Sequence, residues 1–467
     1  MSTTDYRTVS FWFGALAERG DDELRPRPAL ATDIRADVCI VGAGLTGLWT
    51  AYYLAHAHPE LSIVVLDKEI AGFGASGRNG GWSSALFPVS TTGLAKLHGD
   101  EAAVRMRQAM IDTVDEIGRV VSSEPIDCDF VKGGTIAFVR NRPGLHAARD
   151  EVAEAQRFGV DHVTLWGTDE LRRRAPSLTP SATAATFTPD CARIQPAGLA
   201  RGLARVVEGL GVTIYESTRV IDISPGHVDA VGERPATVRA GAIVNATEAY
   251  GSAQPSVGRS VMPLYSLMIA TEPLPDSFWQ GIGIEHGQTF TDYRHLLIYG
   301  QRTADNRFAF GGRGARYHWG STIRPEYDTA TNVAHHLHRA LVELFPEAAD
   351  ARVTHRWGGP LGVPRDWHAS VGFALDTRVG WAGGYVGDGV STTNLAGRTL
   401  ADLITGTDSA ETRLPWVNHR SPRWEPEPLR FLGANAGLLG MATADAEERL
   451  TKRRSIAARL MAPLIGH

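Results

Sequence analysis

Two short stretches of the chain, residues 38–41 and 63–66, are uninterrupted apolar runs. Neither alternates with polar residues, which is typical of strands in a parallel sheet that helices cover on both faces. Residues 48–58 predict a helix between them, and a glycine-rich turn at 42–47 precedes that helix. The pattern is a βαβ unit, and it predicts a doubly wound α/β fold.

The pattern changes after residue 81, where a predicted helix over 101–121 is followed by β-rich segments such as 134–139. Helix and strand alternate again over 198–215, β-hairpins are predicted over 263–312, and strand, glycine turn and helix recur over 380–406. We therefore predict a chain that crosses between two domains more than once. The predicted boundaries are 1–85, 190–255 and 355–410 for a Rossmann-type α/β domain, 86–189 and 256–354 for an interleaved α+β domain built on an antiparallel sheet, and 411–467 for a carboxy-terminal helical extension.

The composition narrows the possible functions. A chain of 467 residues has room for two domains and a buried cofactor. A net charge of -5 provides no basic stripe for a phosphate backbone, so nucleic acid is not expected as a partner. The three cysteines, Cys39, Cys128 and Cys191, are far apart and odd in number, which indicates buried reduced thiols. The opening is polar and no apolar run has the length of a membrane span, so we expect a cytoplasmic protein without a transmembrane segment.

The first glycine turn carries the strongest motif. The sequence VGAGLTG places Gly42, Gly44 and Gly47 in the G-x-G-x-x-G spacing between a strand and a helix. Gly44 lets the backbone approach a pyrophosphate, which the helix amino terminus attracts, and Gly47 permits close helix–strand packing. Asp67, about 20 positions further on, can accept hydrogen bonds from ribose hydroxyls and would repel a 2′-phosphate. The turn therefore predicts FAD or NAD rather than NADP.

A second glycine-rich loop, GFGASGRNGGW at residues 72–82, directly follows the ribose-binding strand. NAD-binding domains usually lack such a loop. Its small residues would let the backbone run along a ribityl chain and a flavin edge, while Arg78 and Asn79 offer donors to phosphate or ring. The alternative is an ordinary surface loop, in which glycine and asparagine are common.

With these motifs the chain resembles the FAD-dependent D-amino acid oxidase/glycine oxidase superfamily, and is most similar to its γ-glutamylputrescine oxidase-like branch. The resemblance covers most of the chain and rests on motifs in the same order: ADVCIVGAGLTGLWTAYYL with VVLDKE, GFGASGRNGG, ARIQPAGLARGLA with GVTIYESTRV, ATEPL, FGGRG, and GYVGDGV with GRTLADLITG. It implies that the α/β domain binds an extended FAD and that the second domain binds the substrate. No cysteine follows Cys191, so we expect the FAD to be non-covalent.

The resemblance also implies which residues contact FAD. Val220 would meet the adenine through its backbone, and the GYVGDGV segment would reach the pyrimidine edge of the ring, where the following helix directs its positive end. The predicted FAD-binding residues are Gly42, Gly44, Leu45, Thr46, Gly47, Asp67, Lys68, Gly74, Ala75, Ser76, Gly77, Arg78, Asn79, Gly80, Gly81, Trp82, Val220, Ala246, Gly384, Gly387, Asp388, Gly389 and Val390.

Asp388 departs from the family pattern, because many relatives carry histidine between these two glycines. A carboxylate near the ring would oppose reduction, so we predict a lower flavin potential than in a histidine-bearing relative. Alternatively, Asp388 caps the following helix, which is a common role for aspartate. The GDG sequence also raises the alternative of an NAD(P)H-dependent flavin monooxygenase, although the GASGRNGG loop favours the amine-oxidising families.

The activity that the resemblance implies is hydride transfer from the carbon beside an amine nitrogen to flavin, giving an imine that water hydrolyses. The substrate would be a small amine or amino acid, with dioxygen or another electron acceptor. The candidate catalytic residues are Tyr265, Arg313, His318 and Trp357. Arg313 could pair with a substrate carboxylate or phosphonate; otherwise these side chains are packed aromatics, a structural histidine and a solvated arginine.

Several alternatives remain open at this level. No lysine lies near Arg313, so an oxidase and a dehydrogenase are both possible, and the chain could be the flavin-bearing subunit of a larger complex. His335, His336 and His338 lie on an amphipathic helix without a partner cysteine or nearby acid, so we expect solvated histidines and no metal. Residues 444–464 combine basic and apolar positions, which predicts packing on the protein body or, less readily, a membrane-surface helix.

Overall fold

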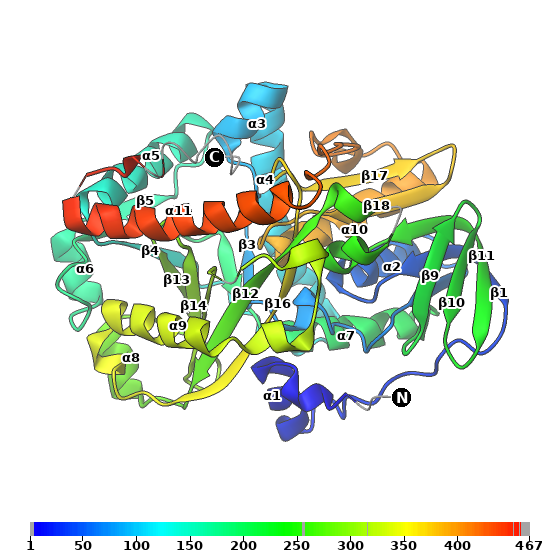
Figure 1. Cartoon of the computed structure of the whole chain (residues 1–467), viewed down its shortest axis with the longest axis horizontal. Helices are drawn as coiled ribbons and strands as arrows, with labels where there is room; N and C mark the ends of the chain where they lie inside the picture. The colour runs from blue at the N-terminus through cyan, green and yellow to red at the C-terminus, as the bar shows by residue number, and fades with distance from the viewer. Residues whose placement is uncertain (1–3, 255–256, 315, 452, 457, 459–467) are drawn as a thin grey trace.

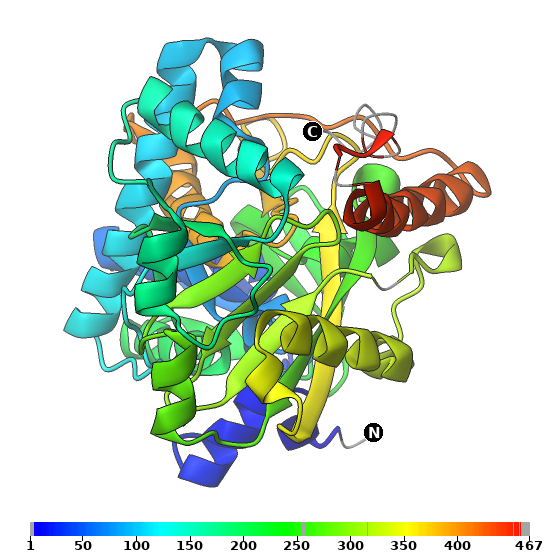
Figure 2. The same cartoon turned by 90° about the vertical axis from the view of Figure 1, so that its left-hand side faces the viewer.

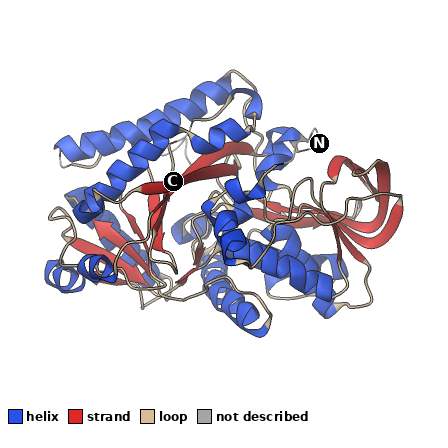
Figure 3. Ribbon diagram, turned by 90° about the horizontal axis from the view of Figure 1, so that it is seen from below, coloured by secondary structure: helices blue, strands red, loops and turns tan. Residues whose placement is uncertain are grey.

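A computed structural model describes residues 4–254, 257–314, 316–451, 453–456 and 458. Two large β-sheets form the frame of the molecule, and helices pack on and between them (Figures 1 and 2). Seen from below, the two groups of strands lie toward opposite ends of the molecule (Figure 3). The predicted two-part architecture is therefore present.

The first sheet contains the predicted βαβ unit. Its strand order is β17-β18-β11-β1-β2-β8, and the neighbours from β18 to β8 are parallel. The strands are β1 (Ile34–Val41), β2 (Ile63–Leu66), β8 (Thr213–Tyr215), β11 (Pro235–Asn245), β17 (Ser370–Ala374) and β18 (Val379–Gly383), and an antiparallel extension from β11 adds β10 (His227–Val231) and β9 (Arg219–Ser224). Helices α2 (Leu45–Ala57), α7 (Pro196–Gly209) and α10 (Gly389–Thr405) belong to this half. The parallel α/β prediction is confirmed.

Helix α2 is central because glycines allow its neighbours to approach closely. A Cβ atom at Gly397 of α10 would lie 2.6 Å from the Cβ atom of Trp49 on α2. Trp49 is fully buried, and every residue of β2 is buried as well. Helix α10 is thereby fixed against α2, so their amino-terminal turns belong to one rigid region.

The second sheet is mostly antiparallel, with the order β16-β12-β15-β14-β13-β4-β6-β5 and one parallel pair, β4 with β13. Its core contains the stacked or edge-packed rings of Phe290, Phe308, Phe310 and Phe345. The strands are β4 (Thr135–Val139), β5 (Thr164–Trp166), β6 (Ala184–Thr188), β12 (Met262–Thr271), β13 (Thr289–Asp292), β14 (Ile298–Arg302), β15 (Phe308–Gly312) and β16 (Val353–Val363).

One predicted domain boundary needs correction. Strand β16 pairs with β12 along its length, from Met262 opposite Val363 to Thr271 opposite Val353. The boundary expected at residue 355 therefore falls inside a strand of the second sheet, and the chain returns to the first sheet only at β17. An apolar strand has the same sequence pattern in either sheet, so periodicity could not assign β16.

The remaining helices and strands complete the two halves. The long helix predicted over 101–121 is present as α4 (Asp100–Ser123). The other elements are α1 (Phe11–Arg19), α3 (Thr91–His98), α4 (Asp100–Ser123), α5 (Arg142–Arg157), α6 (Thr168–Arg174), α8 (Asp276–Ile282), α9 (Thr331–Leu344), α11 (Leu429–Thr451), and the two short strands β3 (Trp82–Ser84) and β7 (Cys191–Arg193), which pair with each other. The predicted carboxy-terminal helical extension contains α11. Part of the predicted helix over 444–464 lies outside the described residues.

The three cysteines are buried and free, as predicted. Within the described part of the chain, no helix is long and apolar enough to cross a membrane. The described residues also contain no group of three or more histidine, cysteine or acidic side chains that could hold a metal ion.

Candidate cofactor and substrate site

The first glycine turn is as tight as its motif predicts. Gly42 has a φ of +109°, and a Cβ atom there would lie 2.7 Å from the carbonyl oxygen of Ala246 at the end of β11. At Gly47, a Cβ atom would lie 2.0 Å from the carbonyl oxygen of Gly42. Gly44 is the amino-terminal cap of α2, and the next amide, that of Leu45, donates to Ser76 Oγ at 2.8 Å. The turn therefore brings the helix amino terminus against the second glycine loop.

Asp67 lies directly after β2, beside this turn. One carboxylate oxygen accepts from the amide of Ala43 at 2.7 Å, and the other accepts from the amide of Glu69 at 2.8 Å. Each oxygen keeps a further acceptor position, as a ribose diol requires. Burial raises the pKa of Asp67 to about 7. The two amide hydrogen bonds hold the Asp67 carboxylate at the position where the motif predicts the ribose.

The expected adenine contact lies next to Asp67. The Thr218 amide donates to the Asp67 carbonyl at 2.8 Å, so β9, which contains Val220, starts beside the ribose-binding residue. The Lys68 side chain, next to Asp67, is two-thirds exposed and pairs with Glu69 at 3.7 Å.

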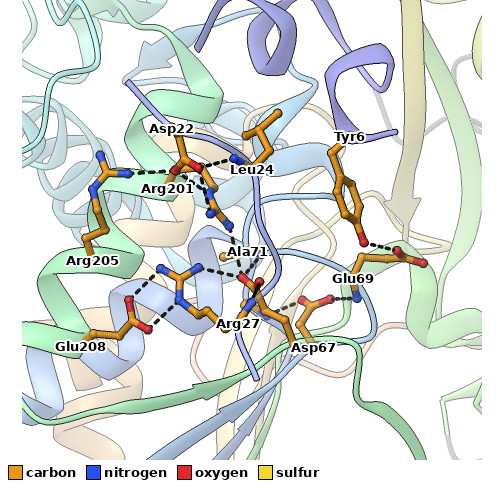
Figure 4. Close-up of polar contacts among 12 residues, drawn as sticks. Tyr6, Asp22, Leu24, Arg27, Asp67, Glu69, Ala71, Arg201, Arg205 and Glu208 are labelled. Carbon is orange, nitrogen blue, oxygen red and sulfur yellow. Dashed lines mark hydrogen bonds and ion pairs between the residues drawn. The ribbon is translucent and has the colours of Figure 1, made fainter. Parts of the chain in front are cut away.

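A buried ionic network supports the loop after Asp67 (Figure 4). The carboxylate of Glu216 is fully buried and accepts from the Ala71 amide at 2.7 Å, from Arg27 Nη1 at 2.8 Å and from Arg201 Nη1 at 3.2 Å. Arg27 also pairs with Glu208 at 2.6 Å. Nothing in the local sequence pattern predicts this network, because Arg27 and Glu216 are 189 positions apart.

The second glycine loop is packed, so it is not an ordinary surface loop. A Cβ atom at Gly77 would lie 2.6 Å from the Gly72 carbonyl oxygen, and one at Gly80 would lie 2.5 Å from the ring of Tyr299. At Gly81, where φ is +71°, a Cβ atom would lie 1.9 Å from Gln301 Nε2. A larger residue at these positions would have to displace the loop's own backbone or the side chains packed against it.

The donors of Arg78 and Asn79 have a different use from the one expected. Arg78 is only 6% exposed, and its guanidinium donates to Asp328 Oδ2 at 2.6 Å and to the Phe73 carbonyl at 2.7 Å. Asn79 Nδ2 donates to the carbonyls of Ala75 and Ser76. These hydrogen bonds of Arg78 and Asn79 hold the loop in shape.

A third loop connects β18 to α10 and lies beside the first two. Gly384 and Gly387 have φ values of +76° and +118°. The Tyr385 hydroxyl is 3.0 Å from Thr46 Oγ1 on α2, and Ser391 Oγ in α10 is 3.0 Å from Ser83 Oγ in β3, directly after the second glycine loop. All three predicted FAD-binding loops therefore converge.

The alternative role of Asp388 as a helix cap is not observed. Asp388 occupies the cap position of α10, but none of the described side chains makes a capping hydrogen bond there. The first-turn amides of α10 are therefore left for another acceptor, and the helix dipole favours an anion at this end.

Glu248, which was not predicted from the sequence, joins the strands that surround these loops. Its φ is +47°, and its carboxylate accepts from the amides of Gly362 at 2.6 Å and Gly384 at 3.1 Å. Burial raises the pKa of Glu248 to about 7. A single acidic residue after an apolar strand, in ATEAY, was the available signal, but its partners, Gly362 of β16 and Gly384 just after β18, are distant in the sequence.

One cavity of about 1470 Å³ connects the second and third loops with the other sheet. The predicted residues that line it are Ala75, Arg78, Asn79, Gly80, Trp82, Arg313, Gly387, Asp388 and Val390. Residues that were not predicted also line it, including Ser266, Tyr299 and Trp367; the Ser266 hydroxyl is 2.6 Å from that of Tyr299. These three come from separate segments, so no local motif could group them.

Arg313 and Asp388 give this end of the cavity one charge of each sign. Arg313 Nη2 donates to the Val386 carbonyl at 2.7 Å, and its guanidinium lies 5.3 Å from the ring centre of Trp367. Burial raises the pKa of Asp388 to about 6, although Arg313 acts in the opposite direction. Burial likewise lowers the pKa of Arg313. The pair can orient a polar substrate that carries a charged group.

The other three candidate catalytic residues are not among the described residues that line the cavity. Tyr265 is 3% exposed, and its hydroxyl accepts from the Arg324 amide at 3.2 Å. His318 stacks on Tyr327 with ring centres 3.4 Å apart. Trp357 is 1% exposed and donates to the Arg78 carbonyl. All three side chains pack against other protein groups, so Arg313 is the candidate that faces the cavity.

The residues present fit FAD. The first turn and Asp67 suit a pyrophosphate and a ribose, the packed second loop suits a ribityl chain, and the uncapped start of α10 suits the electron-rich edge of a flavin ring. The cavity begins where these last two loops meet.

Comparisons with known proteins agree with this interpretation. Residues 37–403 match the profile of the family described as FAD dependent oxidoreductase. The chain is 30% identical to the γ-glutamylputrescine oxidoreductase of Escherichia coli (strain K12) over 383 residues, which is 82% of this chain and 86% of that protein. It is 29% identical to a probable oxidoreductase, OrdL, of Haemophilus influenzae over 388 residues, 82% of this chain and 85% of that protein.

A solved structure supports the fold. The crystal structure of glycine oxidase from Geobacillus kaustophilus has a TM-score of 0.70 and 20% identity, and the similarity covers 83% of this chain and 99% of that one. At this identity, the similarity establishes the shared architecture alone.

Proposed function

Because the chain belongs to the family of FAD-dependent oxidoreductases, we propose that it oxidises the carbon–nitrogen bond of a small amine or amino acid. The observation that carries the proposal is the cavity that starts at the flavin loops and holds Arg313 and Asp388 together. The γ-glutamylputrescine oxidoreductase relative, named for an amine substrate, supports the same class of reaction.

FAD supplies the hydride acceptor, and the chain supplies the binding groups. We assign the ADP half to the first glycine turn, Asp67 and the start of β9, and the flavin half to residues 74–82 and 384–390. Gly42, Gly47 and Gly81 permit the close backbone approach that this placement requires. Ser76 and Asn79 fix the loop between the two halves through the hydrogen bonds described above.

Arg313 and Asp388 act on the substrate. A guanidinium beside the cavity can hold a substrate carboxylate through paired hydrogen bonds. The Asp388 carboxylate, with a pKa of about 6, is mostly ionised at neutral pH and can accept a proton from a substrate ammonium at Oδ1 or Oδ2. A neutral amine is the form whose adjacent carbon donates hydride.

The walls of the cavity exclude water from the reacting carbon. Trp82, Tyr299 and Trp367 line it, and Tyr299 is fixed by its hydrogen bond to Ser266. Trp82 Nε1 donates to the Gly300 carbonyl at 3.2 Å, so its ring is held as well. Rigid aromatic walls position a small amine at low entropic cost.

The final electron acceptor and the location of the protein are parts of the same proposal. We assign dioxygen or another electron acceptor to the reaction and a cytoplasmic location to the protein. We also propose that FAD is held without a covalent bond.

Product analysis tests the proposed reaction. The purified holoenzyme is incubated in air, and in parallel with ferricyanide, with pools of primary amines, secondary amines, and D- and L-amino acids; carbonyl products are trapped with 2,4-dinitrophenylhydrazine. We expect one pool to give a hydrazone and to release ammonia or an amine in equal amount. Holoenzyme that forms no carbonyl product from any pool contradicts the proposal.

A further inference from the structure

Helix α11 and the residues after it form part of the cavity wall. The helix crosses in front of the second sheet and is the red helix in Figure 1. Met441 and Glu448 of α11, and Ser455 and Ile456 beyond it, line the same cavity as Arg313. The family profile ends at residue 403, so this wall is built from a part of the chain that the profile does not match.

Two carboxylates attach α11 to the turn between β13 and β14. Asp445 Oδ1 accepts from the His295 amide at 2.7 Å, and Asp445 Oδ2 accepts from the Leu296 amide at 2.9 Å. Glu448 Oε1 is 3.0 Å from His295 Nε2 and also accepts from the Ser455 amide at 3.1 Å. The helix and the segment that follows it are therefore tied to one turn.

That turn leads into the cavity. Tyr293 on one side of it and Tyr299 on the other both line the cavity. The Tyr293 hydroxyl donates to Glu151 on α5, and Arg454 Nη2 lies 3.1 Å from Asp150 on the same helix. The β13–β14 turn and the segment that follows α11 are therefore both linked to α5.

The cavity is larger than a single small-molecule site requires. A volume of about 1470 Å³ exceeds the 300–1,000 Å³ that is usual for one small-molecule site. Arg313 and Asp388 lie at the end formed by the flavin loops, whereas the α11 residues contribute to the wall together with α5 and the β13–β14 turn. The cavity therefore has room for a flavin ring and for a substrate that extends toward α11.

We infer that α11 is a specificity element that completes the outer wall of the substrate chamber and sets the length of amine that the site accepts. Asp445 is its positioning residue, because it acts through the amides of His295 and Leu296 and so fixes the turn between Tyr293 and Tyr299. The inference that the substrate is an amine rests on the proposed function. The inference that α11 forms the wall rests only on the contacts described above.

The experiment compares the holoenzyme with three variants. Asp445→Ala removes both acceptors, Asp445→Glu restores a carboxylate, and Arg449→Ala changes an exposed side chain of the same helix that does not belong to the cavity lining. Two readouts need no substrate: hydrogen exchange of a peptide covering residues 293–297, and the rate at which ferricyanide reoxidises dithionite-reduced flavin.

For Asp445→Ala we expect at least tenfold faster exchange in 293–297 and at least threefold faster reoxidation, with partial recovery in Asp445→Glu and wild-type values in Arg449→Ala. A rise in exchange without faster reoxidation, or no change in either, overturns the wall role. Among alkylamines from propylamine to octylamine, we expect Asp445→Ala to change KM at least threefold for the longer members only, with kcat kept. A uniform change across the series overturns the length selection.

The same experiment separates the two proposals. If none of the amines bleaches the wild-type flavin, the choice of amine as substrate fails, while exchange and reoxidation still decide whether α11 forms the wall.

Discussion

Gly47 packs against Gly42 so closely that a Cβ atom at position 47 would lie 2.0 Å from the Gly42 carbonyl oxygen. The two residues belong to α2 and to the turn that precedes it, so this contact sets the distance between the helix amino terminus and the ends of β1 and β11. The site for the dinucleotide depends on that distance.

We expect Gly47→Ala to lose most of its bound FAD, because the helix must move away from the turn. Overpacking of this kind costs about 1–3 kcal/mol or more. The measurement is the flavin-to-protein absorbance ratio after gel filtration. Gly209→Ala on α7 is the matched control, since a Cβ atom there has no described atom within 4 Å. Equal flavin content in the two variants would contradict the assigned role of Gly47.

The Glu216 network should contribute strongly to stability. Glu216→Gln leaves Arg27 and Arg201 without their shared buried carboxylate, and breaking a buried ion pair by removing one partner costs about 3–5 kcal/mol. Urea unfolding monitored by circular dichroism measures the loss. Glu208→Gln, which removes a more exposed partner of Arg27, should cost only about 0–1 kcal/mol. Similar losses in both variants would show that the network is not the source of stability.

Asp388 should lower the reduction potential of the flavin. A carboxylate at the start of α10 repels the negative charge that reduction adds, so Asp388→His should raise the potential. Anaerobic reduction with reference dyes measures it. Asp408→His, where the exposed carboxylate pairs with Arg413, serves as the control and should leave the potential unchanged. An unchanged potential in Asp388→His would refute the repulsion.

The same carboxylate should appear in the pH dependence of activity. The pKa of Asp388 is raised to about 6, so the ionised form that can take up an ammonium proton is lost as the pH falls through 6. We expect kcat/KM for amine substrates to fall below that pH and Asp388→Asn to abolish this inflection.

The effect of Asp388 on stability has the opposite sign. A carboxyl pKa that is raised in the folded protein favours folding below the pKa of the unfolded chain, and this contribution to stability is lost as the pH rises through 6.

Arg313 should select for anionic groups on the substrate. A charge-assisted hydrogen bond contributes about 1.5–3 kcal/mol, which corresponds to roughly 10- to 100-fold in affinity. Arg313→Met should therefore raise KM that much for an amine that carries a carboxylate, and much less for an analogue without one. Steady-state kinetics of one matched pair of substrates tests this. Parallel changes for both would assign Arg313 to packing on Trp367 instead.

The parts of the fold that local pattern encodes could be predicted. The apolar runs that become β1 and β2, the glycine turn between them and Asp67 at the end of β2 all depend on neighbours within about 30 positions, as does a βαβ unit in general. Helix α10 and its glycine loop were predictable for the same reason.

The contacts that the sequence pattern missed join distant segments. The Arg78 guanidinium was expected to donate to phosphate or ring, whereas it donates to Asp328, 250 positions away. Glu248 accepts from Gly362 of β16 and from Gly384, which follows β18. Trp357 was a candidate because aromatic side chains are common in substrate pockets. Strand β16 instead places it in a core with Phe11 and Trp12. Which partner a buried polar or aromatic group finds is decided by tertiary packing, and one chain's local periodicity does not contain that information.

The most direct test of the central claim is the anaerobic visible spectrum of the purified holoenzyme, recorded before and after addition of each pool of primary amines, secondary amines, and D- and L-amino acids. We predict that one pool bleaches the flavin absorbance while NADH and NADPH leave it unchanged. A flavin that no pool bleaches and that NADH or NADPH reduces would contradict it, and would identify a pyridine-nucleotide-dependent monooxygenase instead.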